Sequence, residues 1–131
     1  MALAPRAFLT SLFEAAVAAA DPLAAIRAHL PEPPKGRTIV VGAGKAASQM
    51  AAAFESLWDG ALEGVVVARH GPVADCKRIR VLKSAHPVPD EAGLAGSAEL
   101  LRLVEGLTAD DLVVALVSGG GSSLLPAPPE G

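Results

Sequence analysis

The stretch "VVGAGKAA", residues 40–47, predicts both how this chain folds and where it binds a ligand. An apolar run, rich in β-branched residues, ends in two glycines, Gly42 and Gly44, and Lys45 follows at once. Such a run suits a buried strand, and the glycines allow the backbone to turn tightly into a helix. The stretch is not the GxxxxGK[ST] phosphate loop, because it lacks both the first glycine and the Ser/Thr of that motif.

Strand-like runs and helical periodicity alternate along the rest of the chain. Strands are predicted at 38–42, 64–69, 79–84 and 112–118. Helices are predicted at 5–20, 22–30, 45–58 and 91–105. Because strands that alternate with helices form a parallel sheet covered on both faces, we expect an α/β, Rossmann-like three-layer fold preceded by two helices.

The spacing of apolar side chains predicts which helix faces pack on the sheet. For the helix at 45–58 this face consists of Ala47, Met50, Ala51, Phe54 and Trp58. For the helix at 91–105 it consists of Leu94, Ala98, Leu101 and Val104. Asp90 is placed to cap the helix at 91–105. Gly93 and Gly96 are poor helix formers and are expected to weaken the first turn of this helix.

Composition limits the classes of function. The chain has 131 residues, 51% hydrophobic but only 3% aromatic, so one core of Ala, Val and Leu is expected. A net charge of −3 argues against a nucleic-acid partner. Glu14 interrupts the apolar N-terminal stretch, which indicates an amphipathic helix rather than a signal peptide, and no membrane contact is predicted. The single cysteine, Cys76, excludes an internal disulfide and favours a reducing, cytoplasmic compartment.

Three loops of small and polar residues are predicted at one edge of this sheet. They are the turn at 42–45, "SAHPVPDEAG" at 84–93 and "SGGGSS" at 118–123. Ligands of open parallel sheets bind beyond the carboxyl ends of the strands, where all three loops would lie. We therefore expect one binding site, although each loop taken alone also fits a purely structural turn or a hinge.

Each loop offers a different group to a ligand. The lysine and the first amides of the helix at 45–58 favour an anion. Bare glycine amides and serine hydroxyls at 118–123 suit an oxyanion or a carboxylate. Two prolines hold the histidine of the second loop at the strand end. Lys45 is the candidate catalytic residue, and the candidate binding residues are Gly42, Gly44, His86, Ser118, Gly119, Gly120, Gly121, Ser122 and Ser123.

Taken together, "VVGAGKAA", "SAHPVPDEAG" and "LVSGGGSSLLPAPPEG" closely resemble the N-terminal part of the class II glycerate kinases. That family is also known by its MOFRL C-terminal domain, and its members are often labelled hydroxypyruvate reductase. The resemblance runs from the first helix to Gly131. Because family members are roughly three times longer, it implies that residues 1–131 are the N-terminal portion of a larger two-domain protein.

The resemblance implies ATP-dependent phosphorylation of D-glycerate to 2-phosphoglycerate or 3-phosphoglycerate, with Mg²⁺, in a cleft between two domains. Lys45 falls on the family's active-site lysine, and the loop at 118–122 falls on its glycine-rich ligand loop. The lysine would stabilise the transferring phosphoryl group or hold the carboxylate of glycerate. The expected partners are glycerate and a nucleotide, with a homodimer as the candidate assembly.

One loop departs from the family pattern. After the second strand the family usually has an aromatic residue and then Gly-His, whereas this chain reads Arg69-His70-Gly71-Pro72. No role is therefore carried over to this loop, and the sequence leaves the role of His70 open.

Two other functions fit parts of the sequence. Residues 42–47 match G-x-G-x-x-A, as in an NADP-dependent hydroxypyruvate reductase, with Arg69 in place of the acid that would bind the NAD ribose. The two leading helices and the loop at 118–123 have no role in such a dehydrogenase. A non-catalytic sugar-phosphate-binding module would use the same loops without needing Lys45.

Overall fold

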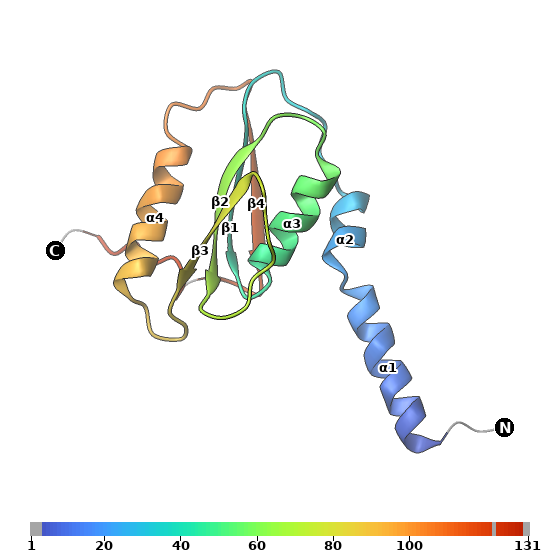
Figure 1. The fold of residues 1–131 in the computed structure, drawn as a ribbon. Helices are drawn as coiled ribbons and strands as arrows, with labels where there is room; N and C mark the ends of the chain where they lie inside the picture. The colour runs from blue at the N-terminus through green and yellow to red at the C-terminus, as the bar shows by residue number, and fades with distance from the viewer. Residues whose placement is uncertain (1–3, 122, 130–131) are drawn as a thin grey trace.

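A four-stranded parallel sheet forms the centre of the fold (Figure 1). The computed structural model describes residues 4–121 and 123–129. The strands are β1 (Thr38–Gly44), β2 (Glu63–Arg69), β3 (Ile79–Ser84) and β4 (Leu112–Ser118). Their order in the sheet is β3-β2-β1-β4, and every neighbouring pair is parallel, as predicted.

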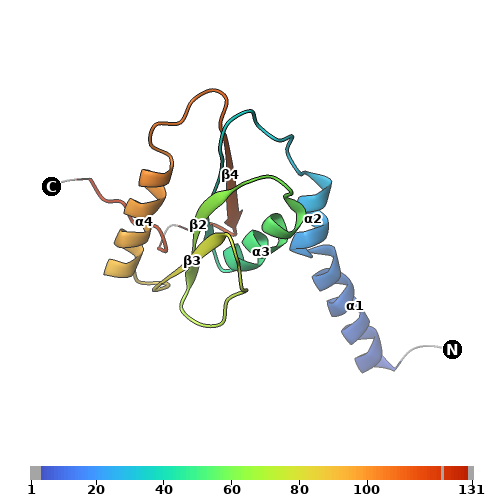
Figure 2. The same ribbon diagram turned by 45° about the horizontal axis from the view of Figure 1, so that its top comes forward.

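Helices cover both faces of this sheet, which confirms the three-layer prediction (Figures 1 and 2). They are α1 (Pro5–Ala19), α2 (Pro22–Ala28), α3 (Ala47–Leu57) and α4 (Glu91–Leu103). The helix α3 lies on one face with α2 beside it, and α4 lies on the other. The helix α3 begins two residues later than predicted, so the lysine at position 45 precedes the helix in a turn.

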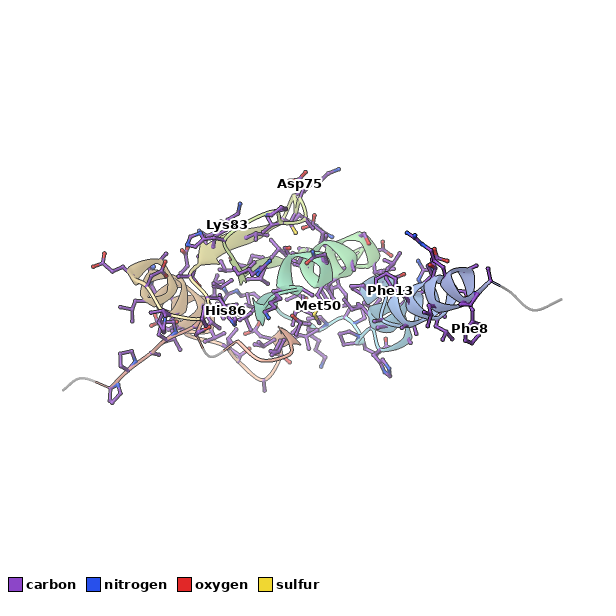
Figure 3. All side chains as sticks on the ribbon, turned by 90° about the horizontal axis from the view of Figure 1, so that it is seen from below. Phe8, Phe13, Met50, Asp75, Lys83 and His86 are labelled. Carbon is purple, nitrogen blue, oxygen red and sulfur yellow. The ribbon has the colours of Figure 1, made fainter. Side chains whose placement is uncertain are left out.

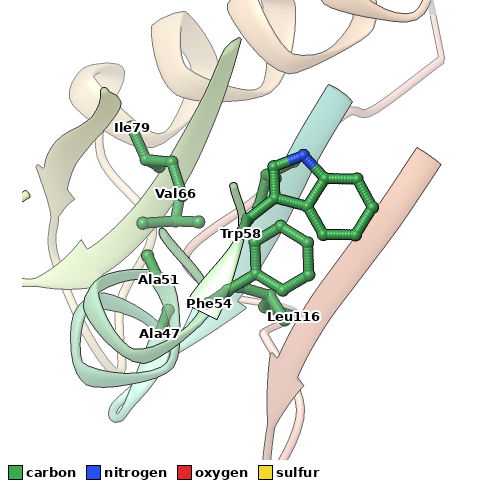
Figure 4. Close-up of a cluster of buried hydrophobic side chains, with 8 residues drawn as sticks. Ala47, Ala51, Phe54, Trp58, Val66, Ile79 and Leu116 are labelled. Atoms are coloured by element: carbon green, nitrogen blue, oxygen red, sulfur yellow. The ribbon is translucent and has the colours of Figure 1, made fainter. Parts of the chain in front are cut away.

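The main core lies between α3 and the sheet (Figure 4). Phe54 and Trp58 stack with ring centroids 5.3 Å apart. They pack with Val40, Val66 and Leu116 from three strands. The predicted face of α3 is confirmed, because four of its five residues are buried and the fifth packs against them.

The predicted packing face of α4 is wrong. Leu94 and Leu101 are 45% and 59% exposed, whereas Gly93, Gly96 and Ser97 are buried. A Cβ at position 96 would lie 3.0 Å from a methyl group of Val67. The glycines that weaken the helix in isolation are thus the residues that let α4 approach the sheet closely.

The helix α1 extends away from the sheet (Figure 1), and every one of its side chains is exposed. Its large apolar residues include Phe8 and Phe13, which are 50% and 69% exposed. Within the described ranges no single helix has the length and hydropathy to cross a membrane, and α1 and α2 meet that test only jointly, as a pair bent by 41°.

Replacing Gly64 in β2 by alanine should destabilise the fold strongly. The added Cβ would lie 2.4 Å from the carbonyl oxygen and 2.8 Å from the Cβ of Val40 on the neighbouring strand. We expect a loss of about 3 kcal/mol in the free energy of unfolding, measured with urea.

Gly106→Ala is the matched control for this substitution. Gly106 has a φ of +67° with nothing within 4 Å of an added Cβ, so only backbone strain of about 1 kcal/mol is expected. Equal effects of the two substitutions would contradict the close approach of β1 and β2.

Candidate functional site

The loops that follow β1 and β4 begin side by side at the carboxyl edge of the sheet, which Figure 3 shows from below. The strand register pairs Gly44 with Ser118. Gly44 has a φ of +132°, and a Cβ there would lie 2.5 Å from both the carbonyl oxygen and the hydroxyl of Ser118. The Ser118 hydroxyl accepts a hydrogen bond of 2.9 Å from the backbone N–H of Ala46. Ser118 therefore fastens the turn that carries the candidate lysine.

Lys45 lies in this turn with its side chain exposed. The helix that follows, α3, has no side-chain cap at its N-terminus, whereas the side chain of Asp90 caps α4. The first N–H groups of a helix carry partial positive charge and need an acceptor. An ammonium group beside an uncapped helix start is suited to bind a carboxylate or a phosphate.

Gly42 occupies a different environment from Gly44. It is buried inside β1, and a Cβ there would lie 2.3 Å from the carbonyl oxygen of Leu116 on β4. The structure thus gives this glycine a packing role between two strands, whereas the sequence had suggested a tight turn or ligand binding.

The glycine-rich loop after β4 has an open part and a fixed part. Gly119 and Gly120 are exposed, with φ of +65° and +93°, and added Cβ atoms would meet nothing within 4 Å. Gly121 instead packs on Ala43, where a Cβ would lie 2.6 Å from the alanine Cβ. The backbone of the first two glycines is therefore accessible to a ligand, and the third positions them.

This loop then crosses the sheet edge from β4 to β3. Leu124 donates its backbone N–H to the carbonyl of Gly121, and its own carbonyl accepts a 3.1 Å hydrogen bond from the buried hydroxyl of Ser84. Ser123 lies half-buried in the turn between them, and Ser122 lies outside the described residues. The crossing brings the predicted loops at 84–93 and 118–123 together.

His86 is exposed in the loop between β3 and α4 and is labelled at this edge in Figure 3. The peptide bond that follows it, to Pro87, is cis. The position agrees with the predicted placement at the strand end.

Sequence reasoning missed a pair of residues at the same edge. The imidazole Nε2 of His70 lies 3.4 Å from a carboxylate oxygen of Asp90, and the second carboxylate oxygen accepts the backbone N–H of Gly93 at 3.0 Å. Backbone hydrogen bonds from Gly93 and then Ala85 hold the pKa of the Asp90 carboxyl below its ordinary value. Only the cap was readable from the sequence, because the partners in the pair are 20 residues apart.

Metal-ligating side chains do not cluster in this part of the chain. Within the described ranges, no three His, Cys, Asp or Glu side chains come together as a metal site would need. Cys76 is half-buried in the loop after β2, where burial first, and then the charges of Glu55 and Asp75, raise the pKa of its thiol to about 11. It is therefore a poor candidate for a thiolate nucleophile or ligand.

Comparison with known families identifies the domain. Residues 8–131 match the family model described as DUF4147, a domain of unknown function. The chain belongs to this family. Within the family model fall Lys45, the glycine-rich loop and the pair formed by His70 and Asp90.

The relatives of this DUF4147 chain carry two different names. A protein of Agrobacterium vitis, 52% identical over 94% of the chain, is named as a hydroxypyruvate reductase. A protein of Thermotoga maritima, 40% identical over 88% of the chain, is named D-glycerate 2-kinase. A crystal structure titled as a glycerate kinase from Thermotoga maritima superimposes with a TM-score of 0.79, at 35% identity over 89% of the chain. The chain spans 28% of each of the two relatives and 29% of the crystallised chain.

The Asp90 cap should make stability depend on pH. Because the folded-state pKa is lowered, the cap stabilises the fold above about pH 4, and this contribution is lost as the pH falls through the lowered value. We expect Asp90→Ala to lower the urea midpoint at pH 7, and the gap to wild type to narrow toward pH 3. Asp90→Ser retains a capping oxygen and should stay near wild type at pH 7. A difference in urea midpoint between Asp90→Ala and wild type that does not change with pH would contradict the role of the Asp90 carboxylate as the cap.

Proposed function

We propose that this chain forms one wall of the active site of a glycerate kinase, which transfers a phosphoryl group from ATP to a hydroxyl of D-glycerate. One observation carries the proposal: Lys45 stands between a glycine that only fits without a Cβ and an uncapped helix start, beside the open backbone of Gly119 and Gly120. The names of the Thermotoga maritima relative and of the solved structure support the same reaction.

This geometry suits phosphoryl transfer because that reaction needs positioned positive charge more than covalent chemistry. Negative charge spreads over the oxygens of the transferred group, and preorganised N–H donors and a lysine stabilise it. The same lysine can instead hold the carboxylate of glycerate throughout the reaction. The product, 2-phosphoglycerate or 3-phosphoglycerate, depends on which hydroxyl of glycerate faces the phosphate donor.

ATP and Mg²⁺ belong to this proposal in different ways. The start of α3 and the glycine-rich loop fit a phosphate or a carboxylate through backbone N–H groups. Within the described residues no three metal-ligating side chains come together. Mg²⁺ would instead be held mainly by the phosphates of ATP, because it usually takes only one or two carboxylates from a protein. A cytoplasmic location and a homodimer stay predictions.

A hydroxypyruvate reductase is the second candidate, favoured by the name of the Agrobacterium vitis relative. Arg69 is exposed at the end of β2, where a dinucleotide-binding domain would contact the cofactor ribose. In this fold, however, Gly121 in the loop after β4 packs on Ala43, the middle residue of the G-x-G turn. Oxidation of NADPH by hydroxypyruvate, followed by absorbance of the nicotinamide, separates the two candidates.

The 131-residue chain should show no glycerate-dependent ATP turnover by itself. Its carboxyl edge is exposed at the positions of Lys45, His86 and Gly120, so a cleft there would need a second wall. Release of ADP is the measurement. Robust turnover by the chain alone would contradict this prediction. The positive comparison is an extended protein, in which these residues are joined to the rest of the Thermotoga maritima relative, of which the chain spans 28%.

Lys45→Ala in the extended protein tests the role of the lysine. If the lysine stabilises charge that grows in the transition state, kcat should fall by roughly 10²–10³-fold. If it holds glycerate equally in both states, the KM for glycerate should rise with kcat unchanged. Lys45→Arg keeps the charge but not the shape, and Lys35→Ala serves as the exposed-lysine control. Wild-type kinetics for Lys45→Ala would refute the proposed site.

A further inference from the structure

His70 is the first residue beyond β2 at the carboxyl edge, and two contacts hold it there. Its backbone N–H donates to the carbonyl of Ser84 at the end of β3, at 3.1 Å. Its imidazole Nε2 lies 3.4 Å from the carboxylate of Asp90 at the start of α4. The side chain is nevertheless 60% exposed. The imidazole is thus fixed on one side and open to a ligand on the other.

Asp90 is itself held in place, which makes it an effective anchor for the imidazole. One carboxylate oxygen accepts the N–H of Gly93 in the first turn of α4, so the other oxygen is directed at His70. The lowered pKa of this carboxyl keeps it ionised near neutral pH. An ionised carboxylate only accepts hydrogen bonds, so the proton lies on Nε2 and, in the neutral ring, Nδ1 is left as an acceptor.

The loop that begins at His70 is tied to the start of α3, close to the candidate lysine. The buried hydroxyl of Ser48 accepts the backbone N–H of Ala74 at 3.1 Å, and the carbonyl of Ser48 is 3.8 Å from the sulfur of Cys76. The strands β1 and β2 are neighbours in register, and the backbones of such strands lie about 4.8 Å apart. The turn after β1 and the residue after β2 therefore start from neighbouring strand ends.

We propose that His70 is a substrate-binding residue and that Asp90 positions it. The free Nδ1 accepts a hydrogen bond from a hydroxyl of a small hydroxy acid whose carboxylate lies beside Lys45. The proposal rests on the proposed function for its substrate, D-glycerate, and adds to it a residue that selects the hydroxyl. Because the partner of Nδ1 is a hydroxyl, an acid of similar size without one should bind less tightly.

Nuclear magnetic resonance on the 131-residue chain tests the contact directly, since it holds only three histidines, His29, His70 and His86. With labelled histidine at about pH 8, the imidazole signals are followed during addition of D-glycerate, propionate or inorganic phosphate. We expect D-glycerate to shift the His70 signals saturably, and propionate to need an about 3- to 10-fold higher concentration for the same shift. The His29 signals should not shift. His70 signals that ignore D-glycerate, or that respond equally to propionate or phosphate, would overturn the proposal.

Two substitutions separate binding from folding in this experiment. Asp90→Ser keeps a cap for α4 but removes the carboxylate that faces His70, so the apparent Kd for D-glycerate should rise about 3- to 10-fold. His70→Phe keeps a planar ring without nitrogens and should weaken binding to a similar extent. A wild-type Kd in both variants would show that neither side chain takes part.

Kinetics of the extended protein distinguish this inference from the proposed function. His70→Phe should raise the KM for glycerate about 3- to 10-fold while leaving the KM for ATP unchanged, with His29→Gln as the control. If the wild-type extended protein turns over and His70→Phe has wild-type constants, the inference fails and the kinase stands. If the 131-residue chain binds D-glycerate through His70 but the extended protein transfers no phosphoryl group to it, the kinase fails and the binding site stands.

Discussion

The close approach of β1 to β4 at the carboxyl edge is the constraint on which the site depends. Gly44 faces Ser118, with 2.5 Å between an added Cβ and the serine oxygens, and Gly121 lies on Ala43 with a similar lack of space. A side chain at position 44 or 121 would push the two loops apart. Without this contact the Ser118 hydroxyl could not hold the N–H of Ala46, and the lysine turn and the glycine-rich loop would not form one surface.

The sequence predicts most of the architecture, because the signals for it are local. A β-branched run bounded by glycine indicates β1, and the spacing of Phe54 and Trp58 indicates which face of α3 is buried. The packing face of α4 was not predictable in this way. Gly93 and Gly96 have poor helix propensity, and their value lies in the approach of Pro126 and Val67, which are distant in sequence.

Part of the candidate site could likewise be predicted from local sequence signals, and part could not. Glycines and a lysine after strands, together with the rule for parallel sheets, are enough to place Lys45 and the glycine-rich loop at one edge. The pairing of His70 with Asp90 is not readable, since it arises from the β2–β3 register and from the direction in which α4 begins. The packing role of Gly42 was missed for a related reason, because its neighbour Leu116 belongs to a strand far along the chain.

The two helices that start at this edge differ in a way that gives the site a direction. The N-terminus of α4 is already occupied by the carboxylate of Asp90, whereas α3 has no side-chain cap and stands next to Lys45. Positive potential is therefore available at α3 and partly neutralised at α4. An anionic group is expected to settle at α3, and the neutral, hydrogen-bonding end of the same ligand should face His70. A hydroxy acid, with a carboxylate at one end and hydroxyls at the other, matches that direction.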